Sequence, residues 1–157
     1  LDSGGIVAGI KLQSQDVSRK VIDGLTEFVK KNGMGGMAYI KIGNDGNISS
    51  PIAKFFTTEK LNEIIEHFEA GNSDTIFILS GEKKKTLQAL GQLRMKLSED
   101  YKLIDESKYE FLWITYFPLF AYDEDEGRYF GEHHIFTMPK SEFLPLLDSN
   151  KEKILKV

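Results

Sequence analysis

The stretch Asp74-Thr75-Ile76-Phe77-Ile78-Leu79 decides how this chain folds, because its last four residues are all apolar. A strand with one face in water alternates apolar and polar side chains, whereas a continuous apolar run is typical of a strand covered on both faces. We therefore predict that residues 74–79 form the central strand of a small sheet.

Three further segments have the pattern of strands. In residues 5–12, apolar side chains alternate so that every second one shares a face, and residues 37–42 read as the next strand. The turn-forming residues 44–47 favour a hairpin into a short strand at 48–50. Pro51 then limits that short strand to an edge or an end of the sheet.

Three amphipathic helices are expected between and after these strands. They cover residues 18–31, with Ser18 as the N-cap, then residues 57–70, and finally about residues 83–101. Asn32-Gly33 should stop the first helix. The expected buried stripes are Val21, Leu25, Phe28 and Val29 in the first helix, Leu61, Ile64, Ile65 and Phe68 in the second, and Leu87, Leu90, Leu93 and Leu97 in the third.

The resulting order β-α-β-β-α-β-α indicates an α+β fold for residues 1–107. We expect a two-layer sandwich with a small, mainly antiparallel sheet and the helices on one face. The polar cluster at residues 105–108 is the expected linker to a second region, residues 108–157.

The second region should contain a β-hairpin. Residues 111–117 are rich in aromatic and β-branched side chains, and Pro118 must end or interrupt that strand. The acidic run at 123–127 supplies a turn, after which residues 129–136 can return as the second strand. Because side chains alternate across a strand, His133 and His134 should point to opposite faces.

Composition narrows the class of protein. A chain of 157 residues with 41% hydrophobic residues suits one compact domain, or one domain plus a fragment of another. It contains no cysteine, and no apolar run approaches the length of a membrane span, so we expect a cytoplasmic protein with no membrane partner. A net charge of −4 argues against strong non-specific binding to nucleic acid, although a local basic patch can still contact phosphates. Because the sequence starts at Leu1, we interpret it as a piece of a longer protein.

Several motifs occur in a specific order. They are Phe-Leu-Trp-Ile at 111–114, Phe-Pro-Leu-Phe at 117–120, Gly-Arg at 127–128, and His-His-Ile-Phe-Thr-Met-Pro-Lys at 133–140. This pattern resembles the bacterial-type aspartyl-tRNA synthetases where their inserted domain rejoins the catalytic core. Upstream, residues 17–23, 36–41 and 50–55 are similar to the insert that those synthetases share with a tRNA-dependent amidotransferase subunit.

The resemblance implies a parent enzyme that is a homodimer and uses ATP and Mg²⁺ to form aspartyl-adenylate, which it transfers to tRNA. The arginine-bearing loop and the glycine-rich segment that hold ATP in this family are missing here. We therefore expect the chain alone to be inactive, with no catalytic residue and no cofactor of its own. The alternative is a non-catalytic, tRNA-associated binding module of an amidotransferase subunit, but that resemblance stops near residue 105.

The resemblance also assigns roles to two groups of residues. It places His133 and His134 at the aspartate pocket of the intact enzyme, against the alternatives of a solvent-exposed pair or metal ligands. We expect no metal site, because adjacent strand residues cannot chelate one ion from one face. The triplet Lys83, Lys84 and Lys85 is a candidate contact for tRNA phosphate, although a solvated helix start is the plainer interpretation.

The hairpin is also a candidate for self-association. In the parent enzyme its strands would pair with core strands, so its edges should be exposed in this chain. We expect residues 109–137 to fold back on the inserted domain or to pair with a second copy.

Overall fold

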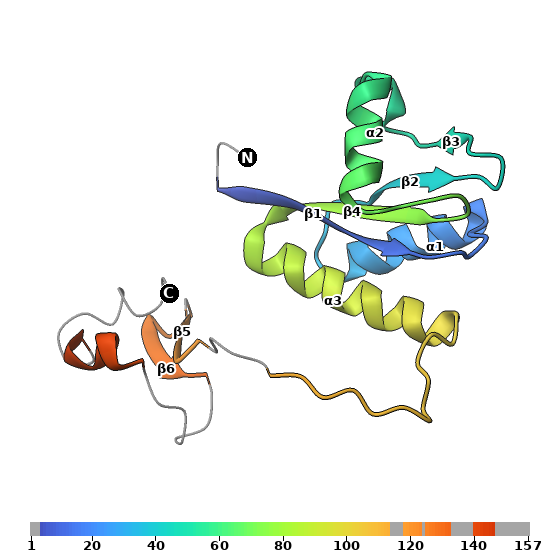
Figure 1. The fold of residues 1–157 in the computed structure, drawn as a ribbon. Coiled ribbons are helices and arrows are strands. Elements are labelled where there is room, and N and C mark those ends of the chain that lie inside the picture. Colours follow the sequence, from blue (N-terminus) through green and yellow to red (C-terminus); the bar gives the residue numbers. More distant parts are fainter. Residues whose placement is uncertain (1–3, 114–117, 124, 133–139, 147–157) are drawn as a thin grey trace. The chain divides into compact units, whose positions relative to one another are not determined.

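The computed structural model describes residues 4–113, 118–123, 125–132 and 140–146, and its contacts divide the chain into two units, Leu1–Glu106 and Ser107–Val157. The first unit contains a four-stranded sheet and three α-helices, and the second contains a two-stranded sheet (Figure 1). The predicted α+β class, the element order and the separate hairpin are confirmed.

The sheet of the first unit is antiparallel throughout and has the strand order β1-β4-β2-β3. Its strands are β1 (Gly5–Leu12), β2 (Ala38–Ile42), β3 (Ile48–Ser49) and β4 (Thr75–Glu82). β4 pairs with β1 on one side and with β2 on the other, which confirms the central position predicted from its apolar run. The turn before β3 contains Gly46 at φ +79°, a conformation that glycine adopts without strain.

Each helix begins within one residue of its predicted start. α1 (Arg19–Lys31) follows Ser18, whose side chain accepts a hydrogen bond from the Val21 amide, and α2 (Thr58–His67) follows Thr57, which caps it in the same way. α3 (Lys83–Asp100) continues directly from β4 without an intervening loop. A 3₁₀ turn, η1 (Ala53–Phe55), lies between β3 and α2.

The placement of the helices corrects the expected two-layer arrangement. Phe77 is fully buried in a cluster with residues from α1 and α3, whereas its neighbour Ile76 is fully buried in a second cluster with Ile40 and Leu61 of α2. Since adjacent residues of a strand point to opposite faces, α2 must cover the face opposite to α1 and α3. Figure 1 shows α2 above the sheet and the other two helices below it, so the unit has three layers.

Two residues of the predicted stripes are exposed instead of buried. Val21 is 36% exposed while the next residue, Ile22, is 4% exposed, and Leu87 is 49% exposed while the preceding Thr86 is fully buried. Each error is a rotation of one residue, about 100°, around the helix axis. Which of two adjacent positions faces the sheet depends on how the helix packs.

In the second unit, β5 (Phe120–Asp123) and β6 (Arg128–Gly131) form the hairpin, followed by η2 (Ser141–Leu146). The Asp123 carboxylate accepts hydrogen bonds from the amides of Asp125 and Glu126, at 2.9 and 3.0 Å, so the acidic run forms the turn as predicted. The first strand was predicted too early. Residues 111–113 belong to no strand, and β5 starts only after Pro118, because pairing begins next to the turn. Residues 114–117 and 133–136 of the predicted strands lie outside the described residues.

Candidate functional site

The lysine triplet lies in the first turn of α3. Lys83, Lys84 and Lys85 are all exposed. The preceding Glu82 is both the last residue of β4 and the N-cap of α3, and its side chain makes no capping hydrogen bond. Amides at a helix N-terminus attract anions, so lysines at this position do not stabilise the helix but do strengthen its attraction for an external anion.

One lysine of the triplet is partly neutralised. The Lys85 ammonium lies 2.9 Å from a carboxylate oxygen of Glu82, and both side chains are more than half exposed. An exposed ion pair of this kind contributes little energy, about 0–1 kcal/mol. Lys85 can therefore exchange Glu82 for an external phosphate at low cost.

The backbone next to the triplet is accessible. A hollow of about 510 Å³ is lined by Gly4, Gly5, Ile6, Val7, Ser80, Gly81 and Glu82. Gly5 pairs with Glu82 in the sheet, and a Cβ on Gly5 would lie only 3.0 Å from the Gly81 carbonyl oxygen. Gly5 therefore lets the β1 and β4 backbones approach closely here, and the hollow lies directly before the lysines of α3.

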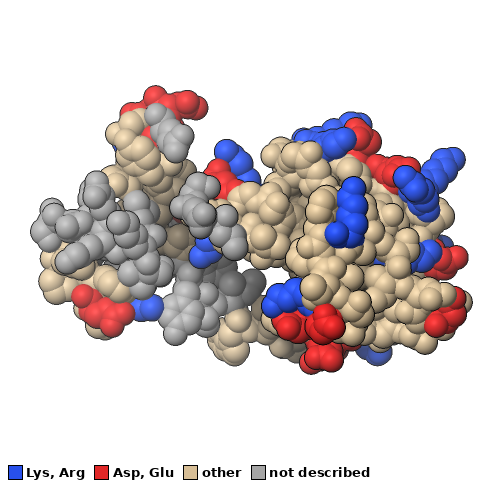
Figure 2. Space-filling view, turned by 90° about the horizontal axis from the view of Figure 1, so that it is seen from above, with Lys and Arg blue, Asp and Glu red and all other residues tan. Residues whose placement is uncertain are grey.

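The face shown in Figure 2 does not form one large basic surface, because its Lys and Arg side chains are interspersed with Asp and Glu. From this face, long-range attraction of a polyanion is therefore weak, and a phosphate contact there must be local.

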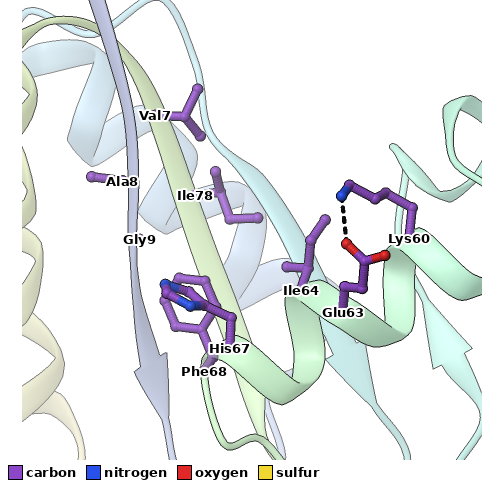
Figure 3. A pocket seen from close by; sticks show the side chains of 9 residues that line it. All are labelled: Val7, Ala8, Gly9, Lys60, Glu63, Ile64, His67, Phe68 and Ile78. Atoms are coloured by element: carbon purple, nitrogen blue, oxygen red, sulfur yellow. Dashed lines mark hydrogen bonds and ion pairs between the residues drawn. The ribbon is translucent and has the colours of Figure 1, made fainter.

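A second hollow, of about 660 Å³, lies between β1 and α2. Figure 3 shows Val7, Ile78, Ile64 and Phe68 around it, with the Lys60–Glu63 ion pair at its rim. Sequence patterns did not predict this hollow, because it forms only when α2 packs on the face opposite to the other helices. The single local signal is Gly9 in the middle of β1, since glycine inside a strand often marks a close approach.

No histidine belongs to a site within the part of the chain that the structure describes. His133 and His134 lie outside the described residues, so their predicted place at an aspartate pocket remains a prediction. His67 is exposed at the end of α2, where its ring contacts Phe68 at 5.6 Å between centroids. Within the described ranges, no group of three His, Cys, Asp or Glu residues could hold a metal ion. In the same part of the chain, no helix is long and apolar enough to cross a membrane.

Comparison with known families identifies the domain family of the first unit. The family model described as the GAD domain matches residues 1–90, which is more than half of the chain. The chain belongs to the GAD domain family. The match covers β1 to β4 and the first part of α3, so it includes the lysine triplet and both hollows.

The relatives of this GAD domain chain extend the match into the second unit. It is 47% identical over 154 residues to the aspartate–tRNA(Asp/Asn) ligase of Geobacillus sp. (strain WCH70), covering 97% of the chain and 26% of that protein. It is 42% identical over 155 residues to the protein of the same name from Lachnoclostridium phytofermentans, covering 98% and 26%. The Persephonella marina protein, also of that name, is 47% identical over 149 residues, covering 94% and 25%. The chain thus spans about a quarter of the length of these relatives, and its predicted resemblance to the aspartyl-tRNA synthetases is confirmed.

Proposed function

We propose that this chain is part of an aspartate–tRNA ligase that uses ATP and Mg²⁺ to form aspartyl-adenylate and then transfers aspartate to tRNA. The observation that carries the proposal is the match to ligases over 94–98% of the chain, which includes both units. In this proposal, residues 1–107 are the inserted domain and residues 108–157 are the return into the catalytic domain. The parent enzyme would be a cytoplasmic homodimer, and ATP and Mg²⁺ would bind to its other parts.

The aspartate pocket is assigned to His133 and His134. A neutral imidazole can hydrogen-bond to the substrate, and a protonated one can complement its carboxylate. If the two histidines lie on one strand, their side chains point to opposite faces. At most one of them then contacts the substrate directly, and the other acts through another group.

The lysine triplet is assigned a supporting contact with tRNA phosphate. It is exposed, lies at a helix N-terminus and is flanked by glycines, so a phosphate can approach the amides as well as the ammonium groups. In the intact protein, Lys83→Ala combined with Lys84→Ala should raise the KM for tRNA and reduce the salt dependence of binding by about one unit of slope per lost contact. The matched control is Lys20→Ala with Lys31→Ala, two exposed lysines of α1. Equal effects of the two double variants would show that only net charge matters.

A non-catalytic module of an amidotransferase subunit is the alternative. The GAD match by itself fits this alternative, because it ends at residue 90. The continued identity with ligases through the second unit favours the ligase.

The deciding experiment compares the 157-residue chain with the full-length protein that contains it. Aspartate-dependent exchange of pyrophosphate into ATP should occur with the full-length protein and not with the chain alone, which lacks the residues that hold the triphosphate. A full-length protein that binds tRNA but shows no aspartate-dependent exchange would support the amidotransferase module instead. Exchange by the 157-residue chain would contradict the proposed division of labour.

A further inference from the structure

The end of α1 contains a pair of residues that is chemically labile in an unfolded chain. Asn32-Gly33 is the only Asn-Gly pair in the sequence. In such a pair the main-chain nitrogen of the glycine can attack the side-chain carbonyl carbon of the asparagine, because glycine has no side chain to shield that nitrogen. Asparagine is accordingly one of the thermolabile residues of proteins. How the fold holds these two residues therefore decides whether the asparagine survives.

The backbone of this pair is fixed by the cap of α1. The Gly33 amide donates a hydrogen bond of 3.0 Å to the Lys30 carbonyl. The Met34 amide donates one of 3.1 Å to the Val29 carbonyl. With Gly33 in the left-handed region at φ +84°, these two bonds form a Schellman motif. Met34 and Val29 are 7% and 0% exposed in the same core cluster, so apolar packing anchors the motif as well.

In this conformation the glycine nitrogen cannot reach the asparagine side chain. Asn32 has ψ 23°, so the Gly33 nitrogen is nearly eclipsed with the Asn32 nitrogen and is turned away from the Asn32 Cβ. The side chain is held in another direction, because its Nδ2 donates a 2.9 Å hydrogen bond to the Phe28 carbonyl. Ring closure therefore requires rotation about the Cα–C bond of Asn32, and this rotation breaks both bonds of the motif.

We propose that Asn32 is a latent site of spontaneous deamidation, and that the cap of α1 keeps it unreactive in the folded domain. When the cap opens, the Gly33 nitrogen gives up its proton and forms a bond to the Cγ of Asn32. The Cγ–Nδ2 bond breaks, and the amide group leaves with that proton as ammonia. Water then opens the resulting cyclic imide at one of its two carbonyl carbons. The products are aspartate and isoaspartate at position 32.

Either product weakens the helix end that protected the site. Aspartate lacks the donor for the Phe28 carbonyl and puts a negative charge beside the last carbonyl groups of α1, where the helix dipole favours cations. Isoaspartate adds a methylene group to the main chain, which displaces Gly33 and Met34 from their acceptors in the last turn. A modified chain therefore keeps a loosened cap.

Asn72 offers a comparison inside the same domain. It precedes Ser73, whose side chain shields the nitrogen that would attack. That nitrogen donates a 3.1 Å hydrogen bond to the Ile42 carbonyl, and the Asn72 Nδ2 donates one of 3.1 Å to the Asn44 carbonyl. Both asparagines are thus held in the folded domain, but only Asn32 has the glycine neighbour that makes it reactive after unfolding. All of these bonds lie within the first unit, so the inference depends neither on the second unit nor on the proposed ligase activity.

The first test compares deamidation in the folded and in the unfolded chain. The 157-residue chain is incubated at mildly alkaline pH with and without concentrated guanidinium chloride, and peptide mapping by mass spectrometry follows each asparagine. In the denaturant, Asn32 should react faster than Asn72. Without it, Asn32 should react at least about tenfold more slowly, because only the fraction with an open cap is reactive. Equal rates at Asn32 in the two conditions would overturn the proposal.

Two matched variants test whether the protection comes from the cap. Met34→Ala removes the apolar anchor of the motif, so deamidation of Asn32 in the folded chain should accelerate by about tenfold. Met37→Ala makes the same chemical change at a partly buried residue that packs against the same cluster but lies outside the motif. It should leave the rate within about twofold. Equal acceleration in both variants would show that global unfolding controls the rate, and would overturn the role of the cap.

The effect of the product on the helix can be measured directly. Asn32→Asp reproduces one product, and Asn32→Ala removes the same donor without adding a charge. The Tm followed by far-UV circular dichroism should fall by about 3–5 °C in Asn32→Asp and by less in Asn32→Ala. An Asn32→Asp chain with an unchanged Tm would contradict the inference that deamidation weakens the end of α1.

Discussion

Substitution of Gly9 by alanine should destabilise the first unit, although alanine is usually the better residue in a folded chain. The added methyl group would lie 2.6 Å from the carbonyl oxygen of Phe77, whereas ordinary contacts begin at 3.4 Å. The Phe68 ring, 2.9 Å from the same point, can rotate away, but the Phe77 carbonyl belongs to the central strand and cannot. Relief therefore requires β1 and β4 to separate locally.

The expected cost follows from measured overpacking of cores, about 1–3 kcal/mol. Gly24→Ala is the matched control, because it makes the same chemical change in α1 at a position where a Cβ would meet nothing within 4 Å. In a helix interior this replacement gains about 1 kcal/mol. The two variants should thus move stability in opposite directions.

Urea unfolding followed by far-UV circular dichroism measures the difference, since Trp113 lies in the other unit and does not report on this one. With a slope of about 1–3 kcal/mol per molar urea, the midpoint of Gly9→Ala should fall by about 1 M, while that of Gly24→Ala should rise slightly. Adding Phe68→Ala should not rescue Gly9→Ala, because the closest atom is backbone. An unchanged midpoint for Gly9→Ala, or full rescue by the second substitution, would refute the reasoning.

Three further outcomes are expected. Thr86 is fully buried and its hydroxyl has no hydrogen-bond partner among the described residues, so Thr86→Val should raise the free energy of unfolding by about 1 kcal/mol in the same urea assay. Hydrogen bonds from its own amide and from Thr57 lower the pKa of Glu59 below its usual 4.5, so its stabilising contribution is present above that pH and is lost as the pH falls through the lowered value. Glu59→Gln should flatten the fall of Tm in acid, and parallel curves for the two proteins would contradict this. In the proposed ligase, His133→Ala or His134→Ala should reduce kcat/KM for aspartate, with a loss of transition-state stabilisation of about 1–3 kcal/mol. The effect on kcat/KM for ATP should be smaller, and steady-state kinetics with each substrate can test both.

Local patterns predicted the elements of this fold well, because their causes are local. Ser18 caps the helix that it was expected to cap, the second helix begins next to Thr57 as expected, and the apolar run of β4 placed that strand in the centre of the sheet. The lack of alternation in the same run also indicated that β4 is covered on both faces. That observation already required a helix on each face, and the expected one-face arrangement was therefore inconsistent with it.

Features that depend on packing were not predictable in the same way. Leu87 and Thr86 are adjacent, and helical periodicity cannot decide which of them faces the sheet, since the choice depends on the shape of the surface that α3 meets. The hollow beside Gly9 depends on the position of α2, which no local pattern encodes. The lysine triplet could be placed at a helix start from sequence, but Gly4 and Gly5 at the start of β1 meet Gly81 at the end of β4 only in the fold.

The two faces of the sheet hold their helices with unequal strength. Twelve of the described residues are buried in the cluster under α1 and α3, but only Ile40, Leu61 and Ile76 are buried under α2. Free energies of local opening follow the apolar contacts that are lost, so α2 can detach while the sheet and the other two helices remain folded. We therefore expect hydrogen exchange to detect opening of α2, and with it of the hollow beside β1, at a lower free energy than global unfolding.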